Sequence, residues 1–394
     1  MKVLHIISSG GMYGAEAVIL NLSRTLNESS HTSALGVFSN SANPNLQLHE
    51  AALKEGIESH LIPCTGQIDR SVTASIRSLV AQTGADVVHA HGYKADVYVY
   101  FALRGTATPF ISTCHNWLKG GLFVSLYGIV DRFVLRTYTK VVAVSDEVQA
   151  RLLKAGVARK KICLIRNGID LRPFTNARPS LRSEADGEHV LIVGWIGRLS
   201  PEKGPDIFLR AAARVLAQCP DARFILAGDG PDLAVLHALT EELKIGESVS
   251  FVGRREDMPA VYASLDIMVS SSRQEGLPMA ILEGMASSLP LIATAVGDVP
   301  TVVRDGSTGI LVDSQNVELL AAGIIRLLQD GALRRRLGCA ARNLVQEEFS
   351  AERMTAEYLK FYEQATRPGS ISSAGSWLAP AVLEKKGGVK RGEK

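Results

Sequence analysis

Short apolar runs rich in β-branched residues alternate with longer segments of helical spacing along almost the whole chain. "KVLHIIS" is followed by "GAEAVILNLSRTL", and "KVVAVS" is followed by "DEVQARLLKAG". This alternation predicts a parallel sheet covered by helices on both faces, because parallel strands need long crossover connections. The pattern lapses in a polar stretch at 171–187 that holds two prolines, and it resumes with "HVLIVGWIG". The sequence therefore predicts an α/β protein with two Rossmann-like doubly wound domains.

A chain of 394 residues is longer than a typical single domain, so two domains are expected. The polar stretch at 171–187 sets the expected boundary between them. We expect an N-terminal domain over 1–170, a linker over 171–187 and a C-terminal domain over 188–349. A last helix is expected over 350–366. The polar remainder, 367–394, is expected to be a flexible tail.

The net charge and the cysteines bear on which partners and which cell compartment are expected. The net charge is +3, and the segment from Glu384 to Lys394, with five basic and two acidic residues, accounts for all of it. The rest of the chain sums to zero, so no nucleic-acid partner is expected. The five cysteines form no C-x-x-C pair, and no run of about 18 apolar residues occurs. We expect a cytoplasmic protein.

In doubly wound sheets, ligands bind beyond the carboxyl ends of the strands, so the segments after the strands matter most. After the first strand comes "SSGGMYGAEAV", with Gly11 and Gly14 just before a helical pattern. Such a turn brings backbone N–H groups close to an anion at a helix N-terminus. The spacing is not G-x-G-x-x-G and no acidic residue ends "SALGVF", so a dinucleotide site is poorly supported. A turn needed only for packing explains the glycines equally well.

Three strand ends of the second half carry similar signals. "GRLSPEKG" places Arg198 and Lys203 at a helix entrance, where two cations can bind a diphosphate. "LAGDGPD" and "SFVGR" follow two further strands, and their backbone groups are candidates for holding a nucleotide base. The candidate residues in these two motifs are Gly228, Gly230, Val252, Gly253 and Arg254.

Histidines follow or end two strands of the first half. "DVVHAHG" puts His89 and His91 on one face of a strand, and no third histidine, cysteine or carboxylate lies at ligand spacing. D-x-D, the common metal–diphosphate anchor, is absent from the chain. We therefore expect packed or hydrogen-bonded histidines and no metal. His115 comes just after "PFISTC", where a structural and a functional role are equally supported.

The most specific motif is "EGLPMAILE", which places Glu275 and Glu283 eight positions apart. Together with the paired Rossmann-like halves, "GRLSPEKG", "AGDGP" and "FVGR", it closely resembles the retaining glycosyltransferases of family 4, which have the GT-B fold. The resemblance covers about residues 1–366. It implies that Arg198 and Lys203 bind the diphosphate of a nucleotide-sugar donor and that Glu283 binds its ribose.

The resemblance also assigns the sugar end of the donor. Glu275 is expected to face the transferred sugar, and His115 to lie beside it. Gly14 resembles the glycine that closes over the diphosphate, although the spread motif "GGMYGAE" leaves Gly11 as the alternative. The backbone between the two glutamates is expected to touch the sugar or the distal phosphate, through Gly276, Leu277, Pro278 and Met279.

The implied reaction transfers a sugar to an acceptor hydroxyl with retention, in cell-envelope or exopolysaccharide synthesis. It needs no metal and no cofactor besides the donor as co-substrate. A double-displacement glycosidase holds its two carboxyl groups about 5–5.5 Å apart. With Pro278 as first helical residue, Glu275 precedes the helix and Glu283 lies more than a turn inside it. We therefore favour front-face substitution, in which the leaving phosphate accepts the proton of the acceptor.

Some alternatives remain open. The segment 117–140 has four basic residues against Asp131, so it suits either an anionic membrane surface near a lipid-linked acceptor or a packed helix. A nucleotide-sugar 2-epimerase shares the fold, and a non-catalytic sugar-nucleotide-binding subunit is a further alternative. The last helix is expected to cross back to the first domain. Donor base, donor sugar, acceptor and oligomeric state are not readable from the sequence.

Overall fold

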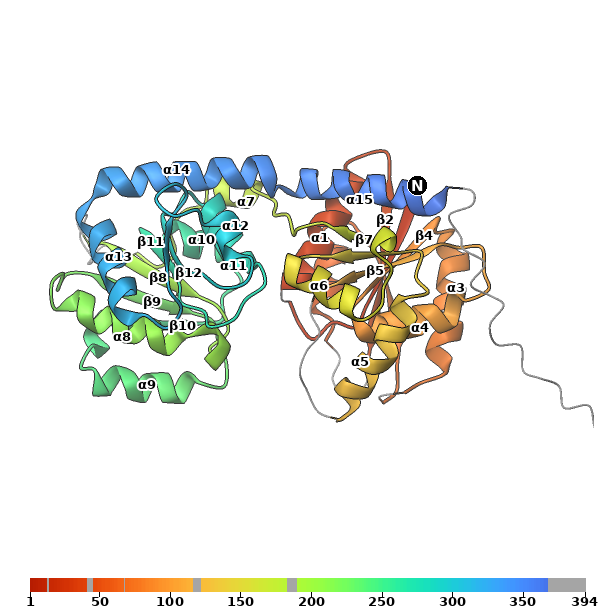
Figure 1. Ribbon diagram of the computed structural model, residues 1–394, viewed down its shortest axis with the longest axis horizontal. Coiled ribbons are helices and arrows are strands. Elements are labelled where there is room, and N and C mark those ends of the chain that lie inside the picture. Colours follow the sequence, from red (N-terminus) through yellow and green to blue (C-terminus); the bar gives the residue numbers. More distant parts are fainter. Residues whose placement is uncertain (13, 41–44, 67, 116–121, 183–189, 368–394) are drawn as a thin grey trace, which may run out of the picture.

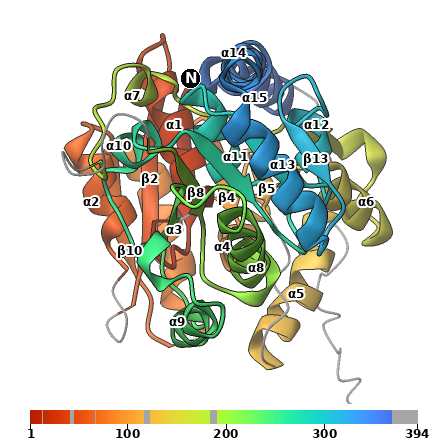
Figure 2. The same cartoon turned by 90° about the vertical axis from the view of Figure 1, so that its left-hand side faces the viewer.

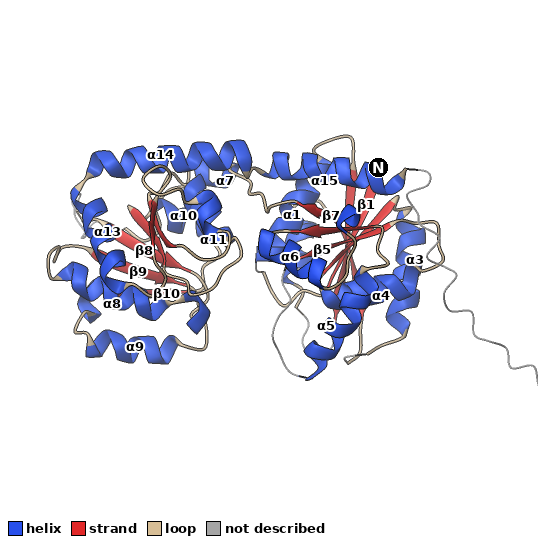
Figure 3. Cartoon of the chain, viewed as in Figure 1, coloured by secondary structure: helices blue, strands red, loops and turns tan. Residues whose placement is uncertain are grey.

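The structure is a computed structural model that describes the chain except for residues 13, 41–44, 67, 116–121, 183–189 and 368–394. Two α/β domains stand side by side, each built on one parallel sheet with helices on both faces (Figures 1 and 3). The predicted fold class is confirmed.

The N-terminal sheet has seven parallel strands in the order β3-β2-β1-β4-β5-β6-β7. The order reverses between β1 and β4, whose carboxyl ends therefore flank the switch point where ligands bind in such sheets. Its strands are β1 (Lys2–Ile7), β2 (Thr32–Ser39), β3 (Glu58–Pro63), β4 (Val87–His91), β5 (Phe110–Cys114), β6 (Lys140–Ala143) and β7 (Ile162–Leu164).

The C-terminal sheet has six parallel strands in the order β10-β9-β8-β11-β12-β13, with its switch point between β8 and β11. Its inner strands are buried on both faces, which is why they read as continuous apolar runs. The strands are β8 (Ile192–Ile196), β9 (Arg223–Ala227), β10 (Val249–Gly253), β11 (Ile267–Ser270), β12 (Leu291–Thr294) and β13 (Ile310–Val312).

Helices cover both sheets. Those of the N-terminal domain are α1 (Gly14–Asn27), α2 (Gln47–Lys54), α3 (Ser71–Thr83), α4 (Tyr93–Leu103), α5 (Leu122–Leu135) and α6 (Asp146–Lys154). The others are α7 (Arg172–Thr175), α8 (Pro205–Leu216), α9 (Leu233–Glu242), α10 (Met258–Ala263), α11 (Met279–Ala286), α12 (Val299–Val302), α13 (Val317–Gln329), α14 (Gly331–Glu348) and α15 (Ala351–Thr366). Apolar faces of helices such as α3, α4, α8 and α13 are buried in the two cores.

The last two helices span both domains. Figure 1 shows α14 and α15 in one line along the top of the molecule, and Figure 2 shows them nearly end on. Whereas α14 packs in the C-terminal core, α15 inserts Met354, Tyr358 and Phe361 among Val3 and Val18 of the N-terminal domain. The final helix therefore belongs to the core of the first domain.

The chain crosses between the domains twice, and the two crossings are hydrogen-bonded to each other. The amide of Ile169 donates to the carbonyl of Phe349 at 2.8 Å, and the amide of Ala351 donates back to Ile169 at 2.9 Å. A Cβ on Gly168 would lie 2.5 Å from the carbonyl oxygen of Ser350, so only glycine fits there. This pair of crossings is where any relative movement of the domains has to bend the backbone.

Candidate active site

Two of the expected donor-binding side chains are joined by an ion pair. Lys203 follows β8, Glu275 follows β11, and their Nζ and Oε1 atoms lie 2.5 Å apart. The Ser272 hydroxyl donates to the same Oε1 at 2.9 Å. The side chain of Glu275 is only 8% exposed, against 28% for Lys203. A ligand here therefore meets a cation that is already held by a carboxylate at the switch point of the second sheet.

Tight backbone packing fixes these two residues relative to each other. Gly204 has φ +65°, and a Cβ there would lie 2.2 Å from the carbonyl oxygen of Ser271. Gly297 has φ +52°, and a Cβ there would lie 1.9 Å from the carbonyl oxygen of Glu275. Because neither position has room for a side chain, the loops after β8, β11 and β12 are pressed together. Closely packed backbone therefore holds Lys203 and Glu275 in place.

Gly228 and Gly230, the predicted positions for close approach to a nucleotide base, have protein backbone on their Cβ side. A Cβ on Gly228 would meet the carbonyl oxygen of Gly197 at 1.9 Å, and one on Gly230 would meet that of Leu199 at 2.3 Å. The amide of Gly228 also donates to the carbonyl of Gly253 at 2.8 Å. The two glycines thus bring the loop that carries Arg198 next to the ends of β9 and β10. Arg198 itself is exposed on that loop.

The second glutamate of the motif has a separate environment. Pro278 is the N-cap of α11 rather than its first helical residue, so Glu283 is the fifth residue of the helix. The hydroxyl of Tyr262 donates to Glu283 Oε2 at 2.7 Å. Desolvation raises the pKa of Glu283, and the Tyr262 hydrogen bond opposes that rise. Glu275 and Glu283 therefore have different partners, Lys203 and Tyr262, and share none of the hydrogen bonds found among the described residues.

The loop between the glutamates meets the N-terminal domain at Gly14. This glycine is the first residue of α1, and a Cβ there would lie 3.3 Å from Met279 Cγ. Gly11 lies in a turn closed by the Ser9 hydroxyl, which donates to the Gly11 carbonyl at 3.0 Å. Gly14 therefore lies against Met279 of the opposite domain. Within the loop, Gly276 is open on its Cβ side, and Leu277 is buried in the C-terminal core.

A second contact between the domains lies at the end of β10. Arg254 donates to Gln47 Oε1 at 3.1 Å, and the amide of Met12 donates to the same oxygen at 3.0 Å. Gln47 thus connects the motif that ends in Val252, Gly253 and Arg254 to the glycine turn after β1. Gln47 was not predicted as a site residue, because a glutamine after a loop has no distinguishing pattern.

A third contact involves Asp298, which caps the short helix α12 after β12. Its carboxylate accepts a hydrogen bond from the amide of Asp146 at 3.3 Å, at the start of α6, and lies 3.9 Å from Arg166 Nε. Burial raises the pKa of Asp298, whereas Arg166 and the Asp146 amide lower it. These residues were also missed by the sequence analysis, since their partners lie more than 130 positions away in the other domain.

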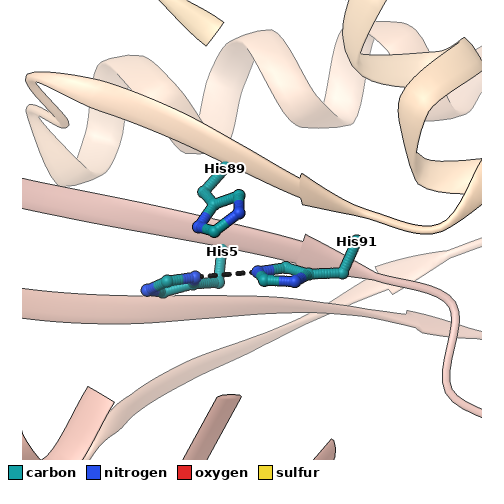
Figure 4. A group of neighbouring side chains, drawn as sticks. All are labelled: His5, His89 and His91. Atoms are coloured by element: carbon teal, nitrogen blue, oxygen red, sulfur yellow. Dashed lines mark hydrogen bonds between the residues drawn. The ribbon is translucent and has the colours of Figure 1, made fainter. Parts of the chain in front are cut away.

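The histidines form a cluster that sequence spacing did not reveal. The sequence analysis found no third histidine near His89 and His91, but β1 pairs with β4 in a register that sets His5 opposite His89. All three are buried, with His5 Nδ1 3.0 Å from His91 Nε2 (Figure 4). His115 extends the group, its Nε2 lying 3.3 Å from His91 Nδ1. The expectation of hydrogen-bonded histidines therefore holds, with His5 as an additional member.

Two protein-family models match the chain, one for each domain. "Glycosyltransferase Family 4" matches residues 12–172, and "Glycosyl transferases group 1" matches residues 178–344. Between them they include nearly all the site residues described above.

Curated relatives extend this similarity. The N-acetyl-alpha-D-glucosaminyl L-malate synthase of Bacillus anthracis is 26% identical over 375 residues, 92% of this chain and 95% of that protein. A D-inositol 3-phosphate glycosyltransferase of Mycobacterium sp. (strain JLS) is 32% identical over 266 residues. That match covers 62% of this chain and 60% of that protein.

Solved structures agree with the fold. Anabaena Alr3699/HepE in complex with UDP-glucose aligns with a TM-score of 0.76 at 22% identity, over 92% of this chain and 100% of that chain. At 22% identity, this similarity is evidence for the fold and not for the function. With both domains matched by their own family models, the chain belongs to the group 1 and family 4 glycosyltransferases and has their GT-B fold.

Proposed function

We propose that this glycosyltransferase transfers a sugar, with retention, from a UDP-sugar to a hydroxyl of a small anionic acceptor. The names of two relatives support the acceptor class, since one gives L-malate and the other D-inositol 3-phosphate. HepE, which was solved with UDP-glucose, supports the donor base. This proposal replaces the envelope polysaccharide of the sequence analysis with a small acceptor as the first choice.

The observation that carries the proposal is the Lys203–Glu275 pair at the second switch point, beside the contact of Gly14 with Met279. In the proposed mechanism the donor diphosphate binds between these elements. Arg198 and Lys203 stabilise the charge that develops on the leaving diphosphate, without a metal ion. As Lys203 turns to the phosphate, the freed Glu275 carboxylate accepts hydrogen bonds from the sugar, and Glu283 does so from the ribose.

Retention is proposed to follow front-face substitution. In a double displacement, a carboxylate next to the anomeric carbon forms a covalent intermediate. Here Glu275 keeps the Ser272 hydroxyl as a partner after Lys203 turns to the phosphate and accepts hydrogen bonds from the sugar hydroxyls, and Glu283 is held by Tyr262, so neither carboxylate is proposed as the nucleophile. The leaving phosphate oxygen then takes the proton of the acceptor hydroxyl as the new glycosidic bond forms and the old one breaks.

The N-terminal domain offers a cation for the acceptor. Lys94 lies in the first turn of α4, just after the switch-point strand β4, with its Nζ 5.6 Å from the ring centre of Phe38. Gly92, the N-cap, has φ +84° and no Cβ contact within 4 Å. The helix N-terminus and Lys94 together favour a carboxylate or phosphate. We propose that they bind the anionic group of the acceptor.

Product analysis tests the proposed function. The enzyme is incubated with UDP-glucose or UDP-N-acetylglucosamine and with L-malate or D-inositol 3-phosphate, with GDP- and ADP-sugars as controls. An α-linked product from an α-linked donor, read from the anomeric proton coupling, supports retention. Turnover that survives EDTA supports metal independence. Conversion of a UDP-sugar without acceptor favours the 2-epimerase, and donor binding without any product favours the non-catalytic subunit.

As a separate proposal, we infer that the region around residues 117–140 contacts a membrane surface peripherally. Residues 117–121 lie outside the described residues, and no helix in the described part is long and apolar enough to cross a membrane. On α5, Ile129 is 64% and Phe133 60% exposed. Next to α5 is a pocket of about 620 Å³ with apolar walls and three arginines, lined by Ile68, Arg70, Arg77, Phe101, Arg104 and Val130 among others. Apolar and cationic groups side by side suit an anionic lipid surface.

Vesicle flotation tests this contact with a matched control. Ile129→Glu and Phe133→Glu are expected to abolish binding to anionic vesicles at low salt. Leu319→Glu, on an exposed leucine of the C-terminal domain, is expected to leave binding unchanged. Wild-type protein that does not float with anionic vesicles overturns the proposal.

A further inference from the structure

Three histidines form a continuous hydrogen-bonded chain that runs from the core of the N-terminal domain to His115. His5 Nδ1 lies 3.0 Å from His91 Nε2, and His91 Nδ1 lies 3.3 Å from His115 Nε2. His5 and His91 are fully or almost fully buried, at 0% and 4% exposure, whereas His115 is half-buried. Figure 4 shows the inner end, with the rings of His5 and His91 edge to edge and His89 above them.

The rings are neutral at physiological pH, which constrains where their protons can lie. Burial lowers the pKa of His5 to about 3 and that of His115 to about 4, and it also lowers the pKa of His91. A neutral imidazole has one N–H donor and one bare nitrogen acceptor. Both hydrogen bonds of the chain can therefore form only when all three rings carry the proton on the same kind of nitrogen, either all on Nδ1 or all on Nε2.

The buried end of the chain distinguishes these two states. His5 Nε2 is buried and has no hydrogen-bond partner among the described residues. In the Nε2–H state this atom would be a buried donor with nothing to accept its proton, and orphaned buried N–H groups are rare. In the Nδ1–H state it is a bare nitrogen, while His5 donates to His91 and His91 donates to His115 Nε2. The Nδ1–H state leaves the proton of His115 on its Nδ1.

A metal ion explains the cluster less well. The group with metal-ligand spacing in the described part of the chain is His5, His89 and His91, without a carboxylate or thiolate. Both ring nitrogens of His89 already meet hydroxyl groups, those of Tyr362 at 2.9 Å and Thr113 at 2.7 Å. A divalent ion would have to break one of these hydrogen bonds and would leave its charge uncompensated in the core.

We propose that His5 and His91 are positioning residues that hold His115 in the Nδ1–H tautomer, so that His115 presents an N–H donor to the donor sugar. Donation to an oxygen of the sugar would orient the donor for transfer. The contact with the sugar rests on the proposed function, whereas the tautomer of His115 does not depend on it.

Nitrogen-15 NMR of histidine-labelled protein tests the tautomer directly. The ¹⁵N shifts and long-range ¹H–¹⁵N couplings distinguish Nδ1–H from Nε2–H, and the His115 signals are assigned by their loss in His115→Asn. We expect Nδ1–H for His115 at pH 7.5 in the wild type. His91→Leu should release His115 to a mixture of tautomers, and His91→Gln should restore Nδ1–H, because its amide can accept from His5 and donate to His115.

The remaining outcomes separate the proposal from its alternatives. His60→Gln, which alters a histidine on β3 outside the cluster, should leave the His115 spectrum unchanged. Nε2–H in the wild type, an unchanged tautomer in a folded His91→Leu variant, or one equivalent of bound metal in the purified protein overturns the proposal. If His91→Leu does not fold, the wild-type spectrum alone still decides the tautomer.

Kinetics test the role of the tautomer with whichever UDP-sugar the enzyme accepts. His91→Leu should lower kcat/KM about tenfold or more, and His91→Gln should recover most of that loss. A changed tautomer with unchanged kinetics overturns the contact with the sugar. Absence of turnover with every UDP-sugar would count against the proposed function and would leave the tautomer result intact.

Discussion

Lys203 and Glu275 face each other across the gap between the loops that follow β8 and β11, with 2.5 Å between nitrogen and oxygen. Glu275 is nearly buried, and its other partner is the hydroxyl of Ser272. In the proposed mechanism, the donor diphosphate draws Lys203 away from this carboxylate, which is then available to the sugar hydroxyls.

Removal of the Lys203 amine tests this exchange. Lys203→Ala should lower kcat by about 10²–10³-fold, because one preorganised cation at the leaving group is lost. It should also lower the free energy of unfolding by about 1–3 kcal/mol, because Glu275 keeps only Ser272 as a partner. Steady-state kinetics and urea unfolding measure the two effects. Arg214→Ala, which breaks the exposed pair with Glu318, should change neither. Unchanged kcat in Lys203→Ala removes this residue from the diphosphate site.

Two glycines with similar backbone conformations provide a matched test of the packing around Glu275. Gly297 has φ +52° and Gly306 has φ +68°, so alanine costs about 1–2 kcal/mol of backbone strain at either position. Only at Gly297 would the new Cβ also meet backbone, 1.9 Å from the Glu275 carbonyl, whereas Gly306 has open space. Gly297→Ala should therefore be the more destabilising change and should reduce donor affinity. Equal midpoints of thermal unfolding for the two variants would contradict the packing argument.

The contact between Arg254 and Gln47 predicts coupling across the domain boundary. Arg254→Ala and Gln47→Ala should each raise the KM for the donor several-fold, because the glycine turn loses its connection to β10. Since both changes remove the same hydrogen bond, the double variant should be little worse than either single one. Additive effects on KM would show that the two residues act independently.

The histidine cluster predicts how stability depends on pH. His5 and His115 have pKa values lowered to about 3 and about 4, below about 6.5 in the unfolded chain. Between these limits the unfolded state binds more protons, so the free energy of unfolding rises with pH. The contribution of these histidines to stability should be full above pH 6.5 and should fall from pH 6.5 towards pH 4.

Thermal unfolding between pH 5 and pH 7.5 measures this dependence. The groups around the cluster are the imidazoles of His89 and His91 and the hydroxyls of Tyr358 and Tyr362, and of these the imidazoles take up protons in this range when the chain unfolds. His5→Gln should give a shallower slope than the wild type. His60→Gln should retain the wild-type slope, and an equally shallow slope there would assign the effect to surface histidines.

The fold was predictable because its signal is local. Alternation of strand and helix patterns can be read segment by segment, and the motifs after the strands are confirmed to follow the carboxyl ends of strands in both sheets. The lapse at 171–187 begins just after the crossing at Ile169, and its Leu171 and Phe174 already pack against the C-terminal core. Helix starts are less certain, and Pro278 is the N-cap of α11 although the sequence suggested the first helical position.

The contacts missed by the sequence analysis depend on register or on domain packing. His5 lies next to His89 only because the register of β1 and β4 pairs these two residues, which are 84 positions apart in the sequence. Gln47 and Asp298 acquire their roles from the opposite domain, which no local pattern specifies. Gly228 and Gly230 also have neighbours that no local pattern specifies, the carbonyls of Gly197 and Leu199.

The position of α15 has a consequence for synthesis of the protein. Val3, Val18 and Leu22 are covered by Met354, Tyr358 and Phe361, which lie more than 330 positions later in the chain. A ribosome therefore releases the segment of the first domain with an apolar surface uncovered, and that surface stays open while the whole second domain is made. Nascent chains are then exposed to aggregation until translation passes Ala365, and a chaperone that binds apolar segments would act during this interval.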